Sequence, residues 1–269
     1  MKIIQISDPH FGTVRPPVAE ALLRLVEDEA PDLAILSGDI TQRARAHEFD
    51  AARAYLDRLH VPEWLVIPGN HDVPLYNLAA RLAAPYAGFQ RVFGNDLEPA
   101  FENETLLALT VKTTRRYRHI DGEVSAEQVE RVAARLRAAT PRQLRIVVTH
   151  QPVFVIREED KNDLLHGHER AVHAWAEAGA DIIMGGHIHL PYTSPLHAAY
   201  PDLTRPVWAV QAGTALSRRI RYESDNSVNV IHYDQPGRCD VRQWDFVPGT
   251  ERFEPAATHE LLLAHPTTP

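Results

Sequence analysis

The sequence predicts an α/β fold with a β-sheet core and helices outside, because two kinds of pattern alternate along the chain. Short apolar runs that are typical of buried strands recur in the first two thirds of the sequence. They are Lys2–Ser7, Leu33–Ser37, Trp64–Ile67, Leu106–Val111, Leu144–Thr149 and Ile182–Met184. Helical patterns lie between them, and this alternation predicts parallel strands joined by right-handed crossovers.

Two of the intervening segments carry clear helical signals. One apolar helical face is formed by Val18, Leu22, Leu25 and Val26. In the other segment, Ser125 with Gln128 is a capping-box pattern, which predicts that a helix begins just ahead of Val129.

The pattern changes to strands and turns after about Pro191. The expected strands are Val207–Gln211, Val228–Tyr233 and Asp240–Phe246, and the sequence 235–237, Gln-Pro-Gly, is typical of a hairpin turn. We therefore expect a mainly β addition and a single domain over residues 1–248. Residues 249–269 are rich in Pro, Thr and His, and we assign no structure to this tail.

Composition excludes several classes of protein. The chain has 269 residues, 44% of them hydrophobic and 24% charged, which is typical of a soluble globular protein and excludes disorder, collagen and coiled coil. Cys239 is the only cysteine, so a disulfide framework is excluded and a metal site must use oxygen and nitrogen ligands. No apolar run approaches the ~20 residues of a membrane span. The first strand begins at once after Met1, without a signal-peptide pattern, so we expect a cytoplasmic protein.

Charge argues against two kinds of partner. The formal net charge is −8, so we expect binding neither to nucleic acid nor to an anionic membrane surface. Both a monomer and a homo-oligomer fit the sequence. The chain also has 15 histidines, and imidazole is the side chain most used for metals and for proton transfer near neutral pH.

Five of the predicted strands end at a cluster of residues that can bind metal. Ligands of open α/β sheets bind at the carboxyl ends of the strands, so we expect these clusters to meet in space. The candidate donors are Asp8, His10, Asp39, Asn70, His150, His187 and His189. Glycines stand just before several of them, at Gly38, Gly69, Gly185 and Gly186, where the backbone can turn sharply and approach a ligand.

Each cluster alone is explained by ordinary turn chemistry, because Asn and Asp favour turns. The five clusters together have no common structural explanation, so we interpret them as a metal site. Seven donors are too many for one tetrahedral zinc ion and suit two five- or six-coordinate ions that share a carboxylate. Imidazole, carboxylate and amide donors without thiolate suit Mn, Fe, Zn or Co. Such ion pairs, ~3.5–4 Å apart, serve phosphoryl displacement.

These motifs, in their order along the chain, resemble the calcineurin-like metallophosphoesterase superfamily. The resemblance implies a four-layer α-β-β-α sandwich of two mixed β-sheets flanked by helices. It also implies a dinuclear centre in which Asp39 bridges the two ions. By the family pattern one ion is held by Asp8, His10 and His189, and the other by Asn70, His150 and His187.

The later part of the chain is similar to a bacterial branch that includes class III cyclic nucleotide and glycerophosphodiester phosphodiesterases. The similar segments are residues 211–214, Asn226 and residues 229–231. One departure is that these enzymes tend to have His-His-Pro where this chain has His150-Gln151-Pro152.

The resemblance gives catalytic roles to two residues that follow Asn70. His71 is implied as the proton donor to the leaving group or as a transition-state clamp, beside a nucleophilic hydroxide that bridges the metals. Asp72 orients His71 or a neighbouring ligand, or else caps the turn before Val73 and Pro74.

Other charged residues remain open candidates. His166 and His168 lie in the charged segment Arg157–Arg170, which forms either a loop over the metals or a solvated loop. His119 and the run Arg115–Arg118 either meet an anionic substrate or form a solvated face. We assign no function to His47, His60, His173, His232, His259 and His265.

The leading functional hypothesis is a dinuclear metal-dependent phosphodiesterase that acts on a small phosphodiester, such as a cyclic nucleotide. Pyrophosphate cleavage in a nucleotide-linked lipid precursor is a second reading, which an apolar cap would favour. A nuclease is a poorer reading because no basic surface is apparent. A non-catalytic scaffold of the same fold would be signalled by lost ligands, and here all seven donors and His71 are present.

Overall fold

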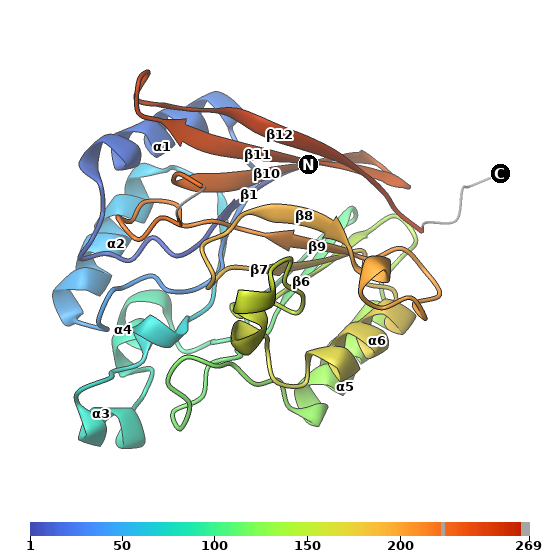
Figure 1. Ribbon diagram of the computed structural model, residues 1–269, viewed down its shortest axis with the longest axis horizontal. Helices are drawn as coiled ribbons and strands as arrows, with labels where there is room; N and C mark the ends of the chain where they lie inside the picture. The colour runs from blue at the N-terminus through green and yellow to red at the C-terminus, as the bar shows by residue number, and fades with distance from the viewer. Residues whose placement is uncertain (222–223, 265–269) are drawn as a thin grey trace.

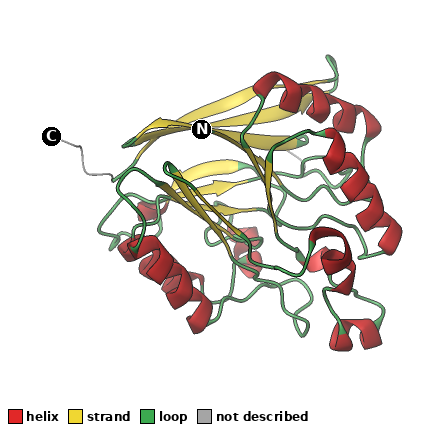
Figure 2. Cartoon of the chain, turned by 180° about the vertical axis from the view of Figure 1, so that it is seen from behind, coloured by secondary structure: helices red, strands yellow, loops and turns green. Residues whose placement is uncertain are grey.

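The computed structural model describes residues 1–221 and 224–264 and shows two six-stranded sheets packed face to face between helices (Figure 1). Seen from behind, the two sheets lie between two groups of helices (Figure 2). The predicted four-layer α-β-β-α sandwich is therefore confirmed.

The first sheet joins the beginning of the chain to its end. Its strands are β1 (Lys2–Ile6), β2 (Leu33–Leu36), β3 (Glu63–Val66), β10 (Ser227–Gln235), β11 (Arg238–Val247) and β12 (Arg252–Leu262), in the order β12-β11-β10-β1-β2-β3. The strands β1, β2 and β3 are parallel, as predicted, and β10, β11 and β12 form an antiparallel meander. The predicted hairpin turn connects β10 to β11. Figure 1 shows these last strands beside the blue β1.

The second sheet is built from the middle of the chain. Its strands are β4 (Ala100–Glu102), β5 (Leu106–Thr110), β6 (Leu144–Val148), β7 (Ile182–Gly185), β8 (Tyr192–Pro195) and β9 (Trp208–Gln211), in the order β4-β5-β6-β7-β9-β8. Strands β5, β6, β7 and β9 are parallel, and the edge strands β4 and β8 run antiparallel to them.

Six helices are present in the described part of the chain. They are α1 (Pro16–Glu29), α2 (Ala46–Arg58), α3 (Leu78–Ala83), α4 (Ala87–Phe93), α5 (Ala126–Arg137) and α6 (His168–Ala178). Of these, α1 and α2 cover the outer face of the first sheet, and α5 and α6 cover that of the second. Short 3₁₀ turns span Asn70–Asp72, Glu158–Asp163 and Leu196–Ala198. The predicted capping box is confirmed, because the Ser125 side chain accepts the backbone N–H of Gln128 at the start of α5. No helix in the described part of the chain is long and apolar enough to cross a membrane.

The strands are apolar on both faces because three cores surround the two sheets. Ile4 and Ile6 of β1 pack with α1 and α2, whereas Ile3 lies in the core between the sheets. A second outer core lies between the other sheet and helices α5 and α6, where Trp175 is fully buried. Strands buried on both sides have continuous apolar runs, which is the pattern that the sequence shows.

One expectation about the C-terminal region is wrong. We assigned no structure to residues 249–269, yet Arg252–Leu262 forms β12, which pairs with β11 along its length. Only two of its side chains, Phe253 and Leu261, are buried, and polar residues interrupt the apolar ones, which hides the strand. His265 and the residues after it lie outside the described part of the chain.

The burial pattern of β12 leads to a test of its contribution to stability. Leu261 has 0% exposure and Leu262 has 64%, because successive strand residues point to opposite faces. We expect Leu261→Ala to lower the free energy of unfolding by about 2–5 kcal/mol, because it leaves a cavity in the core between the sheets. Leu262→Ala is the matched control, with an expected change within about 0.5 kcal/mol. Urea unfolding of the three proteins measures both changes, and equal effects would contradict this packing of β12.

Candidate metal centre

The seven candidate donors of the sequence come together where strands of both sheets end. Asp8 and His10 follow β1, Asp39 follows β2, and Asn70 follows β3. The second sheet contributes the other three donors, after β6 and β7, and these are His150, His187 and His189. The carboxyl ends of these parallel strands therefore bring the candidate donors together.

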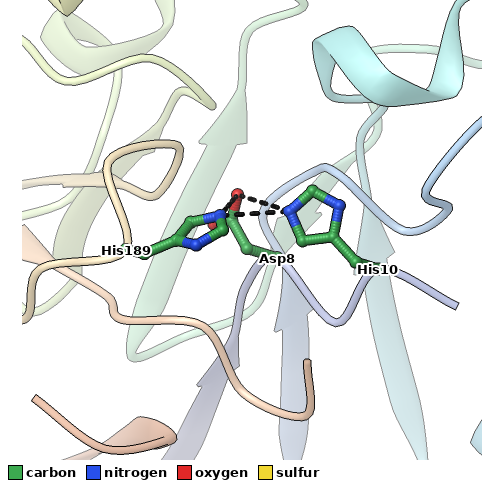
Figure 3. A group of neighbouring side chains, drawn as sticks. All are labelled: Asp8, His10 and His189. Carbon is green, nitrogen blue, oxygen red and sulfur yellow. Dashed lines mark hydrogen bonds and ion pairs between the residues drawn. The ribbon is translucent and has the colours of Figure 1, made fainter. Parts of the chain in front are cut away.

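One group of donors consists of Asp8, His10 and His189, whose ligand atoms lie within 4.8 Å of one another. Figure 3 shows the two imidazole rings and the carboxylate turned toward one point. The Nε2 atoms of His10 and His189 are 3.0 Å apart, and Asp8 Oδ1 lies 3.3 Å from His189 Nε2. This is the first ligand set that the family pattern implies.

A second group consists of Asp39, His150 and His187. His150 Nε2 lies 3.3 Å from Asp39 Oδ1 and 3.2 Å from Asn70 Oδ1. The other carboxylate oxygen of Asp39, Oδ2, lies 3.7 Å from His10 Nε2 in the first group. Asp39 thus turns one oxygen to each group, which is the placement of a carboxylate shared by two ions.

The backbone at the donors adopts an uncommon conformation. Nine described residues other than glycine have a positive φ, and five of them are candidate donors: Asp8, His10, Asp39, His187 and His189, with φ between 44° and 72°. A positive φ is uncommon in residues other than glycine, and each such backbone conformation costs about 1–3 kcal/mol of folding free energy. Their concentration here indicates a site at which the surrounding fold imposes the geometry.

Two of the glycines identified in the sequence allow strand ends to approach the donors closely. A Cβ at Gly69 would lie 2.1 Å from the backbone nitrogen of Asp39. A Cβ at Gly186 would lie 2.0 Å from Ser7 Oγ and 2.5 Å from Asp8 Oδ2. Any side chain at either position would displace a donor-bearing loop.

Buried charges dominate the electrostatics of the centre. Burial alone raises the pKa of the Asp8 and Asp39 carboxyls, but neighbouring histidines, above all His189 for Asp8 and His150 for Asp39, reverse the effect and hold both values below the usual range. Burial lowers the pKa of His10 to about 3. For His150, burial lowers the pKa, but Asp39 outweighs it and raises the value to about 9.

The chemistry of the donors fits metal ions. Asp8 Oδ1 and His187 Nδ1 are buried and have no hydrogen-bond partner in the described structure. The Nδ1 atom of His150 donates to the carbonyl of Ser37, and that of His189 donates to the carbonyl of Arg219. These bonds place the ring proton on Nδ1 and direct Nε2 toward the centre. Histidines that bind metals typically donate their other ring N–H in this way. The described residues therefore fit a dinuclear site.

His71 stands beside the two groups, with its ring edge toward His10 at a centroid distance of 4.8 Å. Its Nδ1 donates to the carbonyl of Gln42 at 2.9 Å, and its Nε2 accepts from Arg219 Nη1 at 2.9 Å. The Nε2 atom therefore faces the open side of the centre. His71 also lies in a possible ligand group with His10 and Asp39, so its separate role stays a prediction.

Asp72 fastens the turns that carry the donors. Its carboxylate accepts backbone N–H groups of Ile40, Thr41 and Gly69 at 2.8–3.0 Å. Burial, followed by the charge of Asp39, raises the pKa of Asp72 to about 7, although the backbone N–H groups act in the opposite direction. These contacts hold the turns around Asp39 and Asn70 together, and no contact joins the Asp72 and His71 side chains in the described structure. A direct catalytic role of Asp72 stays a prediction.

The centre opens into a cleft of about 790 Å³. Its lining includes Gln42, Arg43, Asp163, Arg219 and Arg221, none of which the sequence analysis identified as a site residue. Apolar side chains also line it, and these are Leu75, Tyr76, Ile120, Ile188 and Ile220. The cleft residues come from loops and lack the strand-end pattern that revealed the metal donors.

The open candidates of the sequence separate in the structure. His119 lines the cleft. His166 lies at the surface, with Nε2 3.3 Å from the Asp121 carboxylate. His168, the first residue of α6, contacts the hydroxyl of Tyr200. Of the segment Arg157–Arg170, Asp163 reaches the cleft, with Oδ1 3.6 Å from His187 Nε2.

The charge run before His119 has structural partners. Arg115 donates to Gln128, and Arg118 pairs with Glu123 at 2.9 Å. None of Arg115–Arg118 is among the described residues that line the cleft.

Comparison with known proteins places this site in a family. The model of the calcineurin-like phosphoesterase family matches residues 1–191. A protein of Synechococcus sp. named as a probable cyclic nucleotide phosphodiesterase is 26% identical over 203 residues, which cover 70% of this chain and 73% of that protein.

Two solved structures are similar in fold. A dimetal phosphatase from Danio rerio has a TM-score of 0.71 and 12% identity, and the match covers 98% of this chain and 99% of that one. A purple acid phosphatase from yellow lupin seeds has a TM-score of 0.75 and 13% identity, and the match covers 97% of this chain and 53% of that one.

The position of Asp39 between the two groups leads to a test of metal stoichiometry. We expect two ions per chain at saturation. Asp39→Ala should lower the metal affinity of both positions, because one carboxylate faces both groups. We expect a loss of more than about 10-fold, since even removing a residue that only contacts a metal ligand typically costs about 10-fold in affinity. Metal analysis after equilibrium dialysis against Mn²⁺ measures this.

The matched control for this test is Asp50→Ala, which removes an exposed carboxylate that pairs with Arg91 and should leave two ions bound. A single ion in the saturated wild type, or loss of only one ion in Asp39→Ala, would show that Asp39 is not a bridge.

Proposed function

The chain belongs to the calcineurin-like phosphoesterase family, and we propose that it is a dinuclear metal-dependent phosphodiesterase that hydrolyses a small phosphodiester, with a cyclic nucleotide as the leading candidate. The observation that carries the proposal is the arrangement of Asp39 between two donor groups. Asp8, His10 and His189 would hold one ion and Asn70, His150 and His187 the other, with Mn, Fe or Zn as the candidate metals. Two ions bound there would supply Lewis acidity, positive charge and activation of water at neutral pH.

The cleft supports a small substrate. Its volume of about 790 Å³ lies within the range of small-molecule sites. Polar donors surround the metal centre, while apolar side chains such as Tyr76 and Ile120 form part of the wall. A phosphodiester with a compact organic group would place its phosphate at the centre and that group against this wall. The relative from Synechococcus supports a cyclic nucleotide as the candidate.

His71 would protonate the leaving group in the proposed reaction as an imidazolium, after Nε2, which accepts from Arg219 in this structure, has taken up a proton. The carbonyl of Gln42 fixes the Nδ1 side of the ring, so Nε2 points into the cleft. An alkoxide is a poor leaving group, and a positioned imidazole contributes typically about 10²–10⁴-fold by protonating it.

A second candidate function is pyrophosphate cleavage in a nucleotide-linked lipid precursor. The observation that favours it is the exposed apolar surface on the wall of the cleft and beside it, where Tyr76, Ile120 and Ile220 are 43–78% exposed and Leu78 of α3 is 66% exposed. An acyl chain could cover such a surface. The complete donor set is evidence against the scaffold alternative.

A substrate panel with the Mn²⁺-loaded protein tests the proposal. Phosphomonoesters, bis(4-nitrophenyl) phosphate, cyclic nucleotides and a nucleotide-linked lipid pyrophosphate are compared by kcat/KM. We expect the phosphodiesters to be hydrolysed best and the activity to vanish with a chelator. Preference for the lipid pyrophosphate would establish the second candidate, and absence of all activity in protein with two bound ions would establish a scaffold.

Leaving-group dependence tests the role of His71. We expect His71→Ala to keep both metals and to lower kcat by about 10²–10⁴-fold on diesters with alkoxide leaving groups. Nitrophenyl esters should suffer less, because nitrophenolate leaves without a proton. Stopped assays on both ester types and metal analysis measure these effects.

The matched control for His71 is His166→Ala, since this exposed ring lies outside the cleft, against Asp121. It should change neither activity. Equal losses on both ester types, or loss of metal from His71→Ala, would make His71 a transition-state clamp or a ligand.

A further inference from the structure

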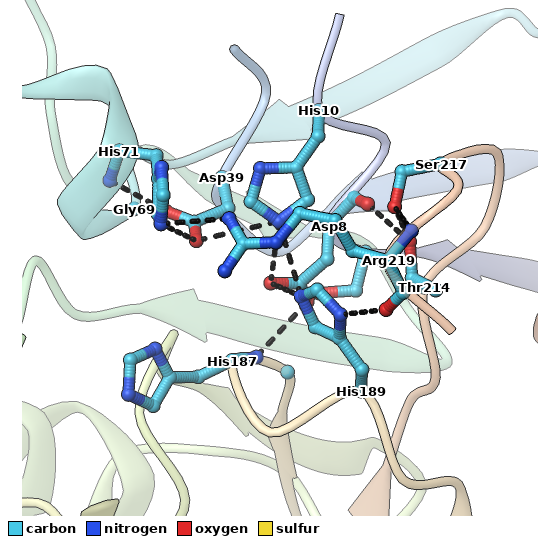
Figure 4. A network of polar contacts seen from close by, with 12 residues as sticks. Asp8, His10, Asp39, Gly69, His71, His187, His189, Thr214, Ser217 and Arg219 are labelled. Atoms are coloured by element: carbon cyan, nitrogen blue, oxygen red, sulfur yellow. Dashed lines mark hydrogen bonds and ion pairs between the residues drawn. The ribbon is translucent and has the colours of Figure 1, made fainter. Parts of the chain in front are cut away.

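Arg219 reaches over the metal centre from a loop that the family model does not cover. The loop follows β9, and residue 219 lies beyond the matched residues 1–191. Figure 4 shows the guanidinium between His71 and His189, on the open side of the centre. Its Nη1 atom lies 2.9 Å from His71 Nε2 and 3.4 Å from Gln42 Oε1. The side chain therefore lies where the substrate enters.

The charge of Arg219 has no anionic partner in the described structure. No carboxylate oxygen of residues 1–221 and 224–264 lies within 4.0 Å of its guanidinium, and only Nη1 makes hydrogen bonds to described residues. The neighbouring Arg221 differs, because Asp160 and Glu159 hold it at 2.8 and 3.4 Å. Arg219 is thus a cation in the cleft with donors left for an incoming anion.

The backbone of the same loop is firmly attached to the metal centre. Thr214 Oγ1 donates to the carbonyl of Asp8 at 2.6 Å and contacts Ser217 Oγ at 2.7 Å. Ser217 Oγ accepts the backbone N–H of Arg219 at 3.1 Å, and the Arg219 carbonyl accepts from His189 Nδ1. The loop therefore presents the guanidinium from a fixed base, and removal of the side chain leaves these contacts in place.

We propose that Arg219 binds the phosphoryl oxygens of the substrate, and that its Nη1 donor moves from His71 Nε2 to the phosphate when the substrate enters. The planar guanidinium matches two oxygens of a phosphate group, and this charge-assisted pair is among the strong hydrogen-bonded contacts of proteins. The exchange also frees His71 Nε2 to take up a proton and then to contact the ester oxygen as a donor. This inference rests on the proposed phosphoesterase function.

Phosphate binding tests the inference without relying on turnover. The Mn²⁺-loaded protein is titrated with inorganic phosphate by calorimetry, and the metal content is measured in parallel. We expect Arg219→Ala to weaken phosphate binding by about 10- to 100-fold, because it removes a hydrogen-bonded charge. The phosphate affinity of Arg219→Lys should lie between those of the wild type and Arg219→Ala, because an ammonium group keeps the charge and lacks the planar pair of donors. In assays, kcat/KM for bis(4-nitrophenyl) phosphate should follow the same order.

The matched control is Arg218→Ala, since Arg218 is exposed and does not line the cleft. Arg218→Ala should bind phosphate as the wild type does. Equal losses of phosphate affinity in both variants would contradict the inference, because they would show an effect of net charge and not of contact with Arg219. Unchanged phosphate affinity in Arg219→Ala would overturn the inference. If the wild type hydrolyses the diester in the same experiment, the proposed function still stands. Loss of metal from Arg219→Ala would also overturn the inference and make the residue part of the centre's architecture. A wild type that binds phosphate but hydrolyses no ester would refute the proposed function alone.

Discussion

The burial of two carboxylates between the ends of two sheets is the constraint on which the site depends. Asp8 and Asp39 are almost fully buried, and an uncompensated buried charge costs several kcal/mol. Imidazole nitrogens of His10, His150 and His189 lie within 4.0 Å of these carboxylates, and the positive charge of His150, whose pKa Asp39 raises to about 9, offsets part of theirs. The same atoms form a donor set for metal ions. Charge compensation and metal binding are therefore two properties of one arrangement.

The rest of the fold holds the donor residues in place despite the strain in their backbone. Five of the seven donors have a left-handed backbone conformation, which isolated peptides avoid, so the surrounding packing must impose it. Part of that support comes from the last third of the chain, where Thr214 binds the backbone of Asp8 and Asn226 donates to the carbonyls of Thr214 and Ser217. Because β10 pairs with β1, this later segment is held beside the first donor loop. The family motifs within residues 1–191 thus depend on chain that follows them.

The α/β class and the meeting of the donors could be predicted from the apolar strand pattern and from the residues at the strand ends, whereas the two-sheet sandwich was implied by the family resemblance of those motifs. Five predicted strands, β1, β2, β3, β6 and β7, stop at a donor, so strand ends and donors were found together. Edge elements leave weaker signals: β12 has few buried side chains, and the short β4 and β8 were not predicted for the same reason. Helix α6 was expected only as part of the alternation of strands and helices and was given no bounds, because its first turn continues a charged segment that is typical of a loop. Hydrogen bonds such as that between His71 and Gln42 join loops distant in sequence, and no local pattern encodes them.

Substrate recognition is least predictable because it depends on how separate loops face one cleft. The departure from His-His-Pro at Gln151 illustrates this, since the Gln151 side chain turns away from the donors and donates to the carbonyl of Ile120 at 3.0 Å. It also accepts from Thr113, so it joins the start of the loop after β5 to Ile120 on the cleft wall. Arg219, which comes from the loop after β9, contacts His71 in the same cleft. The departure from the family pattern at Gln151 therefore lies against the wall of the cleft and outside the donor set, so the residues of the wall can differ between relatives that share the donors.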